Sequence, residues 1–280
     1  MSKDKRRPFA MCQGGTSKIM RPALLGVWLA CLSGTAEGAT IRVSLIGDGS
    51  DPSTWTGAYS SVASAIEFAT AGDEIWVASG RYNESLQLKD RIALFGGFAG
   101  LSDSDRFESR DWRVYETILD ASGFNDRVLV GADQATLDGL TITGGKRARN
   151  PLMDGGSGLT CRNFSMSIRN CFFHDNGQAG GLDRPEPASG GAIFCTDSDL
   201  LIERCVFLNN IGYVGGAISV SFETSPSSVF LINCLIDHNS SPAIAGSGGN
   251  GAMINCTFGN FNPTYSPTLA PGSTALLLSV

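Results

Sequence analysis

The feature that most constrains this chain is a short phrase that recurs four times between residues 157 and 260. The copies are MSIRNCFFHDN (166–176), LIERCVFLNN (201–210), FLINCLIDHN (230–239) and AMINCTFGN (252–260). Their cysteines, Cys171, Cys205, Cys234 and Cys256, lie 34, 29 and 22 residues apart. About 22 residues suffice for three short strands at roughly 3.3 Å per residue with their turns, so each copy can stack on the next. The repeat therefore predicts a parallel β-helix.

The order of apolar residues within one copy predicts where each coil bends. Met166 and Ile168 alternate as one strand face does, and Cys171 and Phe173 alternate as another. The step from Ile168 to Cys171 is odd, so a straight strand would send the two pairs to opposite faces. We therefore expect a corner between them, whose second residue is Asn in three of the four copies. Asn tolerates left-handed backbone angles and could form a ladder from coil to coil. These corner positions are Asn170, Arg204, Asn233 and Asn255.

The same alignment predicts three columns of interior side chains, because a single coil cannot bury its apolar face without its neighbours. They are Phe173, Phe207, Ile236 and Phe258; Cys171, Cys205, Cys234 and Cys256; and Ile168, Ile202, Leu231 and Met253. A Gly-Gly-Ala-Ile tetrad at 190–193 and again at 215–218 begins the next strand, and three copies close on Asn176, Asn210 and Asn239.

These motifs resemble a known group of proteins. The tetrads, with Phe-x-x-Asn at 173–176 and 207–210, resemble the repeats of polymorphic outer membrane proteins. More widely, residues 60 to 260 are similar to secreted bacterial right-handed β-helix proteins of the pectin-lyase-like superfamily, with GDEIWVA (72–78), FGGFAG (95–100), RDW (110–112) and LDGLTI (137–142) in the first coils. The resemblance implies the fold and no single activity, since the superfamily includes lyases, hydrolases and adhesins.

The chain begins with an export signal. Six basic residues precede a ten-residue apolar run, 23–32, which is too short to span a bilayer and suits a signal peptide. We divide the chain into a signal peptide at 1–36, an N-terminal segment with a capping helix at 37–72, and the β-helix at 73–280. Residues 59–71 place apolar residues at helical spacing, and this helix could cover the open end of the β-helix. The chain stops within a predicted strand, 274–280, as a truncated gene product would.

Strands are expected at 75–78, 86–88, 92–95, 117–119, 127–130 and 135–143, giving about seven coils of an all-β, single-stranded, right-handed parallel β-helix. Three excursions leave this path, at 99–116, 144–156 and 177–189. Loops that leave one corner of a solenoid lie side by side, so we expect them to form one wall, where such proteins usually place ligands.

Charge narrows the range of partners. The whole chain carries −6, and a mature chain starting at Glu37 has 15 basic and 26 acidic residues, or −11. Such a surface argues against nucleic acid, whose phosphates need a basic face. We expect a secreted or cell-surface monomer without a transmembrane span. We expect no cofactor, although the polar run Ser102-Asp103-Ser104-Asp105 could bind Ca2+.

Six cysteines remain after signal cleavage, and an even number in an exported chain commonly indicates disulfides. Here Cys161 and Cys195 share one repeat position and the other four share another, each pointing into a packed column. Free thiols, which pack as small hydrophobes, are therefore favoured over disulfides.

Two functions from different classes remain. The first is a non-catalytic β-helix that serves adhesion or glycan binding, with Arg147, Arg149, Asp183 and Arg184 of the loop wall as ligand-binding residues. Guanidinium groups one coil apart could pair with carboxylates along an acidic glycan. The second is a polysaccharide lyase or glycoside hydrolase acting on acidic polysaccharide. It would need a charged base with Ca2+, or two facing carboxylates, and no motif for either is present. We predict no catalytic and no metal-binding residues.

Overall fold

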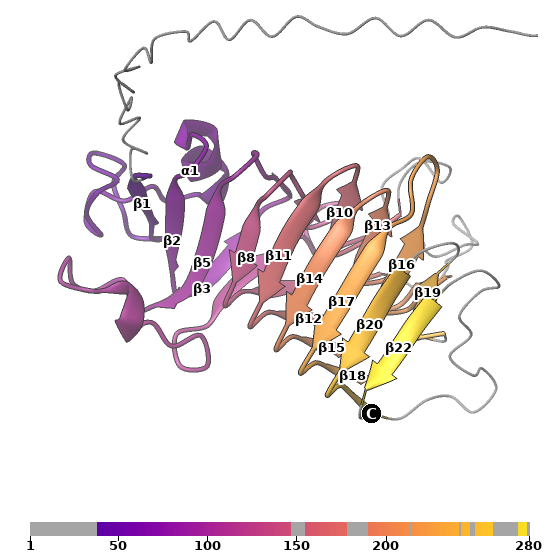
Figure 1. Cartoon of the computed structure of the whole chain (residues 1–280). Coiled ribbons are helices and arrows are strands. Elements are labelled where there is room, and N and C mark those ends of the chain that lie inside the picture. Colours follow the sequence, from indigo (N-terminus) through magenta and orange to yellow (C-terminus); the bar gives the residue numbers. More distant parts are fainter. Residues whose placement is uncertain are drawn as a thin grey trace, which may run out of the picture. The chain divides into compact units, whose positions relative to one another are not determined.

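The computed structural model describes residues 38–146, 155–177, 190–212, 214–240, 242–246 and 250–259, together with the backbone of a strand at 274–278. Three parallel sheets run through this part of the chain (Figure 1). Sheet 1 contains, in spatial order, β1 (Thr40–Val43), β2 (Glu74–Ala78), β5 (Ala93–Phe98), β8 (Thr136–Asp138), β11 (Ser165–Arg169), β14 (Asp199–Glu203), β17 (Ser228–Ile232), β20 (Asn250–Ile254) and β22 (Thr274–Leu278).

The other two sheets take their strands from the same coils. Sheet 2 contains β3 (Gly80–Asn83), β6 (Thr117–Asp120), β9 (Thr141–Thr143), β12 (Phe172–His174), β15 (Val206–Leu208), β18 (Leu235–Asp237) and β21 (Thr257–Phe258). Sheet 3 contains β4 (Leu86–Gln87), β7 (Leu129–Val130), β10 (Leu159–Arg162), β13 (Ile193–Thr196), β16 (Ile218–Ser221) and β19 (Ile244–Gly246). The chain passes through sheets 1, 2 and 3 in turn, and six coils have all three strands. The predicted parallel β-helix is confirmed, and a seventh coil holds β20 and β21.

The predicted interior columns are confirmed by the register. Phe173 pairs with Phe207 and Phe207 with Ile236, and these three side chains are almost fully buried. The two phenyl rings stack with centroids 5.1 Å apart and planes 12° from parallel. Met253 and Phe258, in the seventh coil, are only partly buried. Stacking across coils therefore supplies the core that no single coil could form.

The predicted corner lies between sheets 1 and 2. Asn170, Arg204, Asn233 and Asn255 all have left-handed backbone angles, with φ between 50° and 55°. The expected ladder is present where Asn255 Nδ2 donates to Asn233 Oδ1 at 2.5 Å. In the earlier coils Arg204 Nε donates to Asn170 Oδ1 at 2.9 Å, and Asn170 Nδ2 donates to Asp138 Oδ1 at 2.7 Å. The ladder therefore mixes amide, guanidinium and carboxylate groups.

A second, buried ladder holds the corner between sheets 2 and 3, and it explains the closing asparagines. Asn176 Nδ2 donates to Asn210 Oδ1 at 3.1 Å, and Asn210 Nδ2 donates to Asn239 Oδ1 at 2.9 Å. Each amide also donates to a backbone carbonyl in the preceding coil. An aliphatic side chain here would leave buried backbone groups without partners, which accounts for the Phe-x-x-Asn pattern.

The N-terminal part differs from the expectation in two ways. The helix α1 (Val62–Phe68) is shorter than the predicted 59–71, and the Ser61 side chain caps it by accepting from Ser64 N at 3.1 Å. Its buried face joins the main core, as a capping helix requires. In addition, β1 pairs with β2, so sheet 1 begins 33 residues before the expected start of the β-helix at 73. The short strand β3 was also not expected.

The predicted single strand at 135–143 is wrong, because it consists of β8 and β9. Gly139 separates them with φ +75°. Leu137 pairs with Ile168, and Ile142 pairs with Phe173, so the odd step that marks the later corners is present here too. Glycine occupies the left-handed corner that asparagine occupies later.

The expectation of one loop wall is wrong for the first excursion. Residues 99–116, which include the short 3-10 helix η1 (Phe107–Ser109), leave between sheets 1 and 2. The excursions at 144–156 and 177–189 both leave between sheets 2 and 3, from neighbouring coils. The first excursion therefore stands at a different corner of the β-helix.

All six described cysteines are free and buried, as the free-thiol interpretation predicts. Burial raises the pKa of the Cys234 thiol to about 11 and that of Cys195 to about 12. Both are therefore neutral at physiological pH and pack as small apolar groups. Within the described residues, no helix is long and apolar enough to cross a bilayer.

Candidate functional site

The predicted ligand-binding residues Arg147, Arg149, Asp183 and Arg184 lie outside the described residues, so their role stays a prediction. The ends of the second excursion are described. Lys146 Nζ donates to the Ser122 carbonyl at 3.1 Å. Gly155 packs against the Phe194 ring so closely that a Cβ at this position would lie 1.9 Å from it. The excursion therefore returns to the outer face of sheet 3.

A groove lies at a different corner of the β-helix, where the chain passes from sheet 1 to sheet 2. It consists of two adjoining hollows of about 410 Å³ and about 850 Å³ that share part of their lining. We call this site the corner groove. Its lining residues are Trp112, Arg113, Glu116, Gly139, Leu140, Thr141, Asn170, Cys171, Phe172, Arg204, Cys205, Val206, Asn233, Cys234, Leu235, Asn255 and Thr257. The groove thus crosses the coils from β9 to β21.

The repeat itself builds one side of the corner groove. Because successive coils pair in parallel and in register, the corner position of every coil recurs along the groove at the inter-strand spacing of roughly 4.8 Å. Arg204, Asn233 and Asn255 are exposed there, whereas Asn170 is nearly buried. A row of polar side chains at this spacing matches a polymer whose units repeat at a similar length.

The first excursion supplies the other side, and a buried ion pair fixes it. Arg110 Nη2 lies 2.8 Å from Asp138 Oδ1, and both side chains are less than a tenth exposed. The Arg110 guanidinium also lies 4.5 Å from the Phe107 ring centroid and 5.3 Å from that of Trp112. Since Asp138 accepts from Asn170, the excursion and the corner ladder share one carboxylate. This arrangement holds Trp112 beside the corner residues.

The groove carries more positive than negative groups. Arg113 and Arg204 are exposed, and neither forms an ion pair with another described residue. Among the described lining residues Glu116 is the one acidic group, and its Oε1 accepts from Thr141 Oγ1 at 2.9 Å. On a chain whose net charge is −6, two exposed guanidinium groups make the groove a favourable approach for an anion.

The described lining does not contain the paired carboxylates that glycoside hydrolysis requires, because Glu116 stands alone. Over the described ranges, no cluster of three or more His, Cys, Asp or Glu side chains could hold a metal ion. In the run 102–105 that left Ca2+ open, Asp103 Oδ1 accepts from Trp55 N at 2.6 Å. That carboxylate pins a neighbouring loop, which is a structural role.

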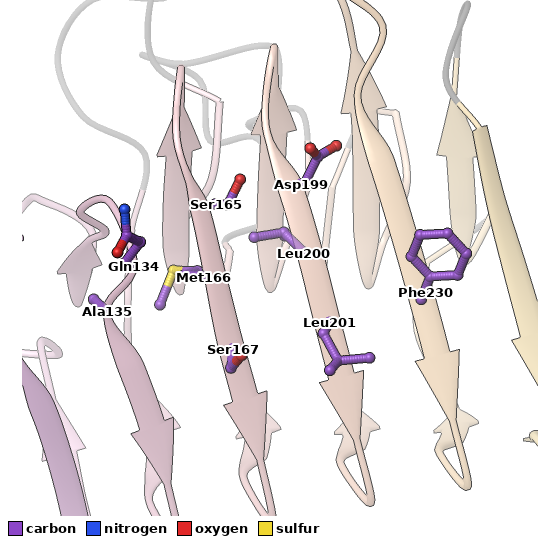
Figure 2. A pocket seen from close by; sticks show the side chains of 9 residues that line it. All are labelled: Gln134, Ala135, Ser165, Met166, Ser167, Asp199, Leu200, Leu201 and Phe230. Carbon is purple, nitrogen blue, oxygen red and sulfur yellow. The ribbon is translucent and has the colours of Figure 1, made fainter. Parts of the chain in front are cut away.

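A smaller depression of about 380 Å³ lies on the outer face of sheet 1 (Figure 2). It is lined by Gln134, Ala135, Ser165, Met166, Ser167, Asp199, Leu200, Leu201 and Phe230. Polar groups gather at the starts of β11 and β14, and Phe230 stands across them on β17. Of the three outward residues of β11, Ser165 and Ser167 line the depression, and their small side chains leave the hollow between larger neighbours.

Sequence reasoning missed the corner groove, although part of its signal was present. The corner row Asn170, Arg204, Asn233 and Asn255 was predicted, but only as a structural ladder. The tripeptide Arg110-Asp111-Trp112 served only to establish a resemblance. Nothing in the sequence indicates that the first excursion folds back along this corner, because Arg110 and Asp138 are 28 residues apart and meet only in the tertiary structure.

Comparison with known proteins identifies the fold. A family model described as right handed beta helix region matches residues 117–274, which is more than half of the 280 residues. No curated protein matches the chain. Among solved structures, deglycosylated pectin methylesterase from Aspergillus niger is 16% identical, with a TM-score of 0.49 and coverage of 82% of this chain and 69% of that one. A penultimately deglycosylated form of the same enzyme gives 16% identity, a TM-score of 0.44 and coverage of 87% and 82%.

Proposed function

Because the chain belongs to the right-handed β-helix family, whose fold by itself defines no single activity, we propose its function from the corner groove. The chain is an exported, non-catalytic β-helix protein that binds an acidic glycan at the cell surface. The apolar run after the basic N-terminus supports export, and the tetrads similar to those of polymorphic outer membrane proteins support a surface role.

The observation that carries the proposal is the set of groups along the corner groove. Arg113 and Arg204 can pair with carboxylates, since guanidinium groups bind them through two parallel hydrogen bonds. Asn255 Nδ2 donates to Asn233 Oδ1, so these exposed residues offer hydroxyl groups the donor Nδ2 of Asn233 and the acceptor Oδ1 of Asn255. Trp112 adds an indole beside them, and aromatic faces pack against the C–H faces of sugars. A chain of uronic acid residues presents all three partners.

The test is binding of oligogalacturonates to a variant that loses charge without losing the corner. Asn occupies the positions equivalent to 204 in three coils, so Arg204→Asn keeps a residue that tolerates the left-handed angle. We expect the Arg204→Asn, Arg113→Gln double variant to bind at least roughly tenfold more weakly, with an unchanged thermal midpoint.

The matched control is Arg91→Asn, Arg106→Gln, which removes the same charge from exposed positions outside the groove, one of them also left-handed. An equal loss in the control would show that net charge alone governs binding. A third variant, Arg147→Ala with Arg149→Ala, tests the loop wall. If only this variant loses binding, the acidic-glycan site lies in the excursions and the corner groove is not the site.

The second candidate is a polysaccharide lyase or glycoside hydrolase acting on acidic polysaccharide. Glu116 and Arg113 line the same hollow, so one acidic and one basic group are close to any bound sugar. Incubation with polygalacturonate, followed by ultraviolet absorbance for unsaturated products and by reducing-end analysis, distinguishes the two. Turnover that disappears in Glu116→Gln would replace the binding proposal with the enzymatic one.

A further inference from the structure

The depression on the outer face of sheet 1 has groups that the proposed function does not use. Phe230 is 44% exposed, and its ring borders the depression. It lies across β14 from the two serines of β11, since the register aligns Ser167, Leu201 and Phe230. An exposed ring beside small polar residues is a surface that a flat, partly apolar ligand can cover.

The polar groups of the depression are available to such a ligand. Asp199 uses Oδ1 to accept from Ser228 N at 3.1 Å, and no described group bonds its Oδ2. Gln134 donates from Nε2 to Asp133 Oδ2 at 3.1 Å, which leaves its carbonyl oxygen unused among the described residues. The hydroxyls of Ser165 and Ser167 likewise make no hydrogen bond to a described group. Acceptors therefore outnumber donors at this site.

The charge at the depression excludes the ligand class of the corner groove. Asp199 lines it and Asp133 lies next to Gln134, whereas the described part of the lining contains no basic residue. A uronate would bring its carboxylate close to these two, at a cost that grows as water leaves. A neutral ligand rich in hydroxyl donors suits the unused acceptors.

We propose that this depression, made by Phe230, Asp199, Gln134, Ser165 and Ser167, is a binding site for a neutral pyranose. The apolar C–H face of the sugar packs on the Phe230 ring, and its hydroxyls donate to the Asp199 carboxylate on the adjacent strand β14. The site is independent of the corner groove, because the two have no lining residue in common.

The test uses two probes that differ only at C6: methyl β-galactopyranoside, which is neutral, and methyl β-galacturonopyranoside, which is charged. Ligand-observed saturation-transfer NMR is sensitive enough to detect weak binding of either probe. We expect saturation of the neutral probe by the parent protein, and an affinity roughly tenfold lower in Phe230→Ala. Phe230→Trp should retain binding, and Asp199→Asn should let the charged probe bind more nearly as the neutral one does.

Phe222→Ala is the matched control, because Phe222 is 50% exposed and does not line the depression. Phe230 faces outward, so its loss leaves the interior columns intact and folding is not at risk. The proposal is overturned if the neutral probe is not saturated by the parent, if Phe230→Ala leaves the signal unchanged, or if Phe222→Ala reduces it equally. The acidic-glycan proposal is untouched by any of these results.

Discussion

Within the described residues, aromatic side chains from other segments cover the outer face of sheet 1 over its first strands, and none covers it over the later ones. At β2 and β5, Trp76 stacks on Phe98 with ring centroids 4.6 Å apart, and Phe107 from the first excursion packs edge-on against Phe95 at 4.8 Å. Trp55, from the segment after β1, completes this cluster. From β11 to β17 the same face carries Ser167, Leu201 and Phe230 with no described segment over them.

The difference teaches that the sheet does not determine where a ligand can bind. Both regions are paired in parallel, although a β-bulge between Trp76 and Ala78 shifts the register of β2 and β5, whereas β14 and β17 pair without a shift. Where long segments leave the coil, their aromatic residues cover the sheet and form a second small core. Where the turns are short, the outward side chains stay accessible. The segments between strands therefore decide which parts of the regular scaffold are buried and contribute to stability, and which parts stay accessible to a ligand.

The largest expected loss of stability comes from a substitution in an interior column, and it gives a scale for the effects on the outer face. Phe207→Ala empties a fully buried site between Phe173 and Ile236, which should lower the free energy of unfolding by roughly 3–5 kcal/mol. Denaturant unfolding followed by fluorescence measures it. A loss below about 1 kcal/mol would mean that the stacked column does not carry the core.

The covered and the uncovered region of the outer face of sheet 1 can be compared directly by replacing one phenylalanine in each. Phe98 is 1% exposed, so Phe98→Ala should cost about 3 kcal/mol, at the lower end because surface segments can collapse into the space. Phe230→Ala should change stability by no more than about 0.5 kcal/mol, as exposed substitutions do. Equal losses, measured in the same denaturant titration, would abolish the distinction between the two regions.

A third change asks whether the ion pair that fixes the first excursion matters to the covered region. Arg110→Met keeps an apolar stem against Phe95 and Phe107 but leaves Asp138 with only its bond from Asn170. The expected cost is roughly 1–3 kcal/mol. Adding Asp138→Asn should recover part of it, because no buried charge then lacks its partner. A double variant as unstable as the sum of the two single changes would contradict this.

The smallest expected effect concerns the turn at residues 223–225, near the uncovered region. A carboxylate holds this turn, whereas aromatic packing holds the segments of the covered region. Asp197 accepts from the backbone N–H of Glu223 at 2.7 Å and from the N–H and hydroxyl of Thr224. The Glu223 backbone N–H bond is the main reason that the pKa of the Asp197 carboxyl falls to about 2. Because the folded pKa is below the ordinary 3.8, the contact stabilises the turn above that value and is lost as the pH falls toward 2.

Amide chemical shifts of residues 223–225 should therefore titrate with a midpoint near 2, while amides next to the aromatic cluster at Phe98 and Phe107 should not follow them. Asp197→Asn is the control, since it keeps an acceptor but does not titrate. A midpoint of 3.8 would show that these N–H groups do not hold the carboxylate.

What could be predicted from the sequence is the part that local periodicity encodes. The odd step between Ile168 and Cys171 fixes a corner, and the recurrence of Cys, Phe and Asn fixes the register, because each position must fall in the same column of every coil. The columns, the left-handed corner and the free thiols followed from that. The split of 135–143 was within reach, since Leu137 and Ile142 show the same odd step, with glycine in place of asparagine.

What the tertiary structure alone decided is where the irregular segments lie. Arg110 carries no periodicity that points to Asp138, and the covering of Trp76 by Phe107 depends on a loop of 18 residues for which no repeat dictates a path. Strand β1 is too short to be distinguished by pattern from the segment around it. The regular coils can be predicted from the spacing of residues, because the same local pattern recurs in each of them. The corner groove and the depression at Phe230 depend on long-range contacts and on the paths that the described segments take between strands, which no local spacing specifies.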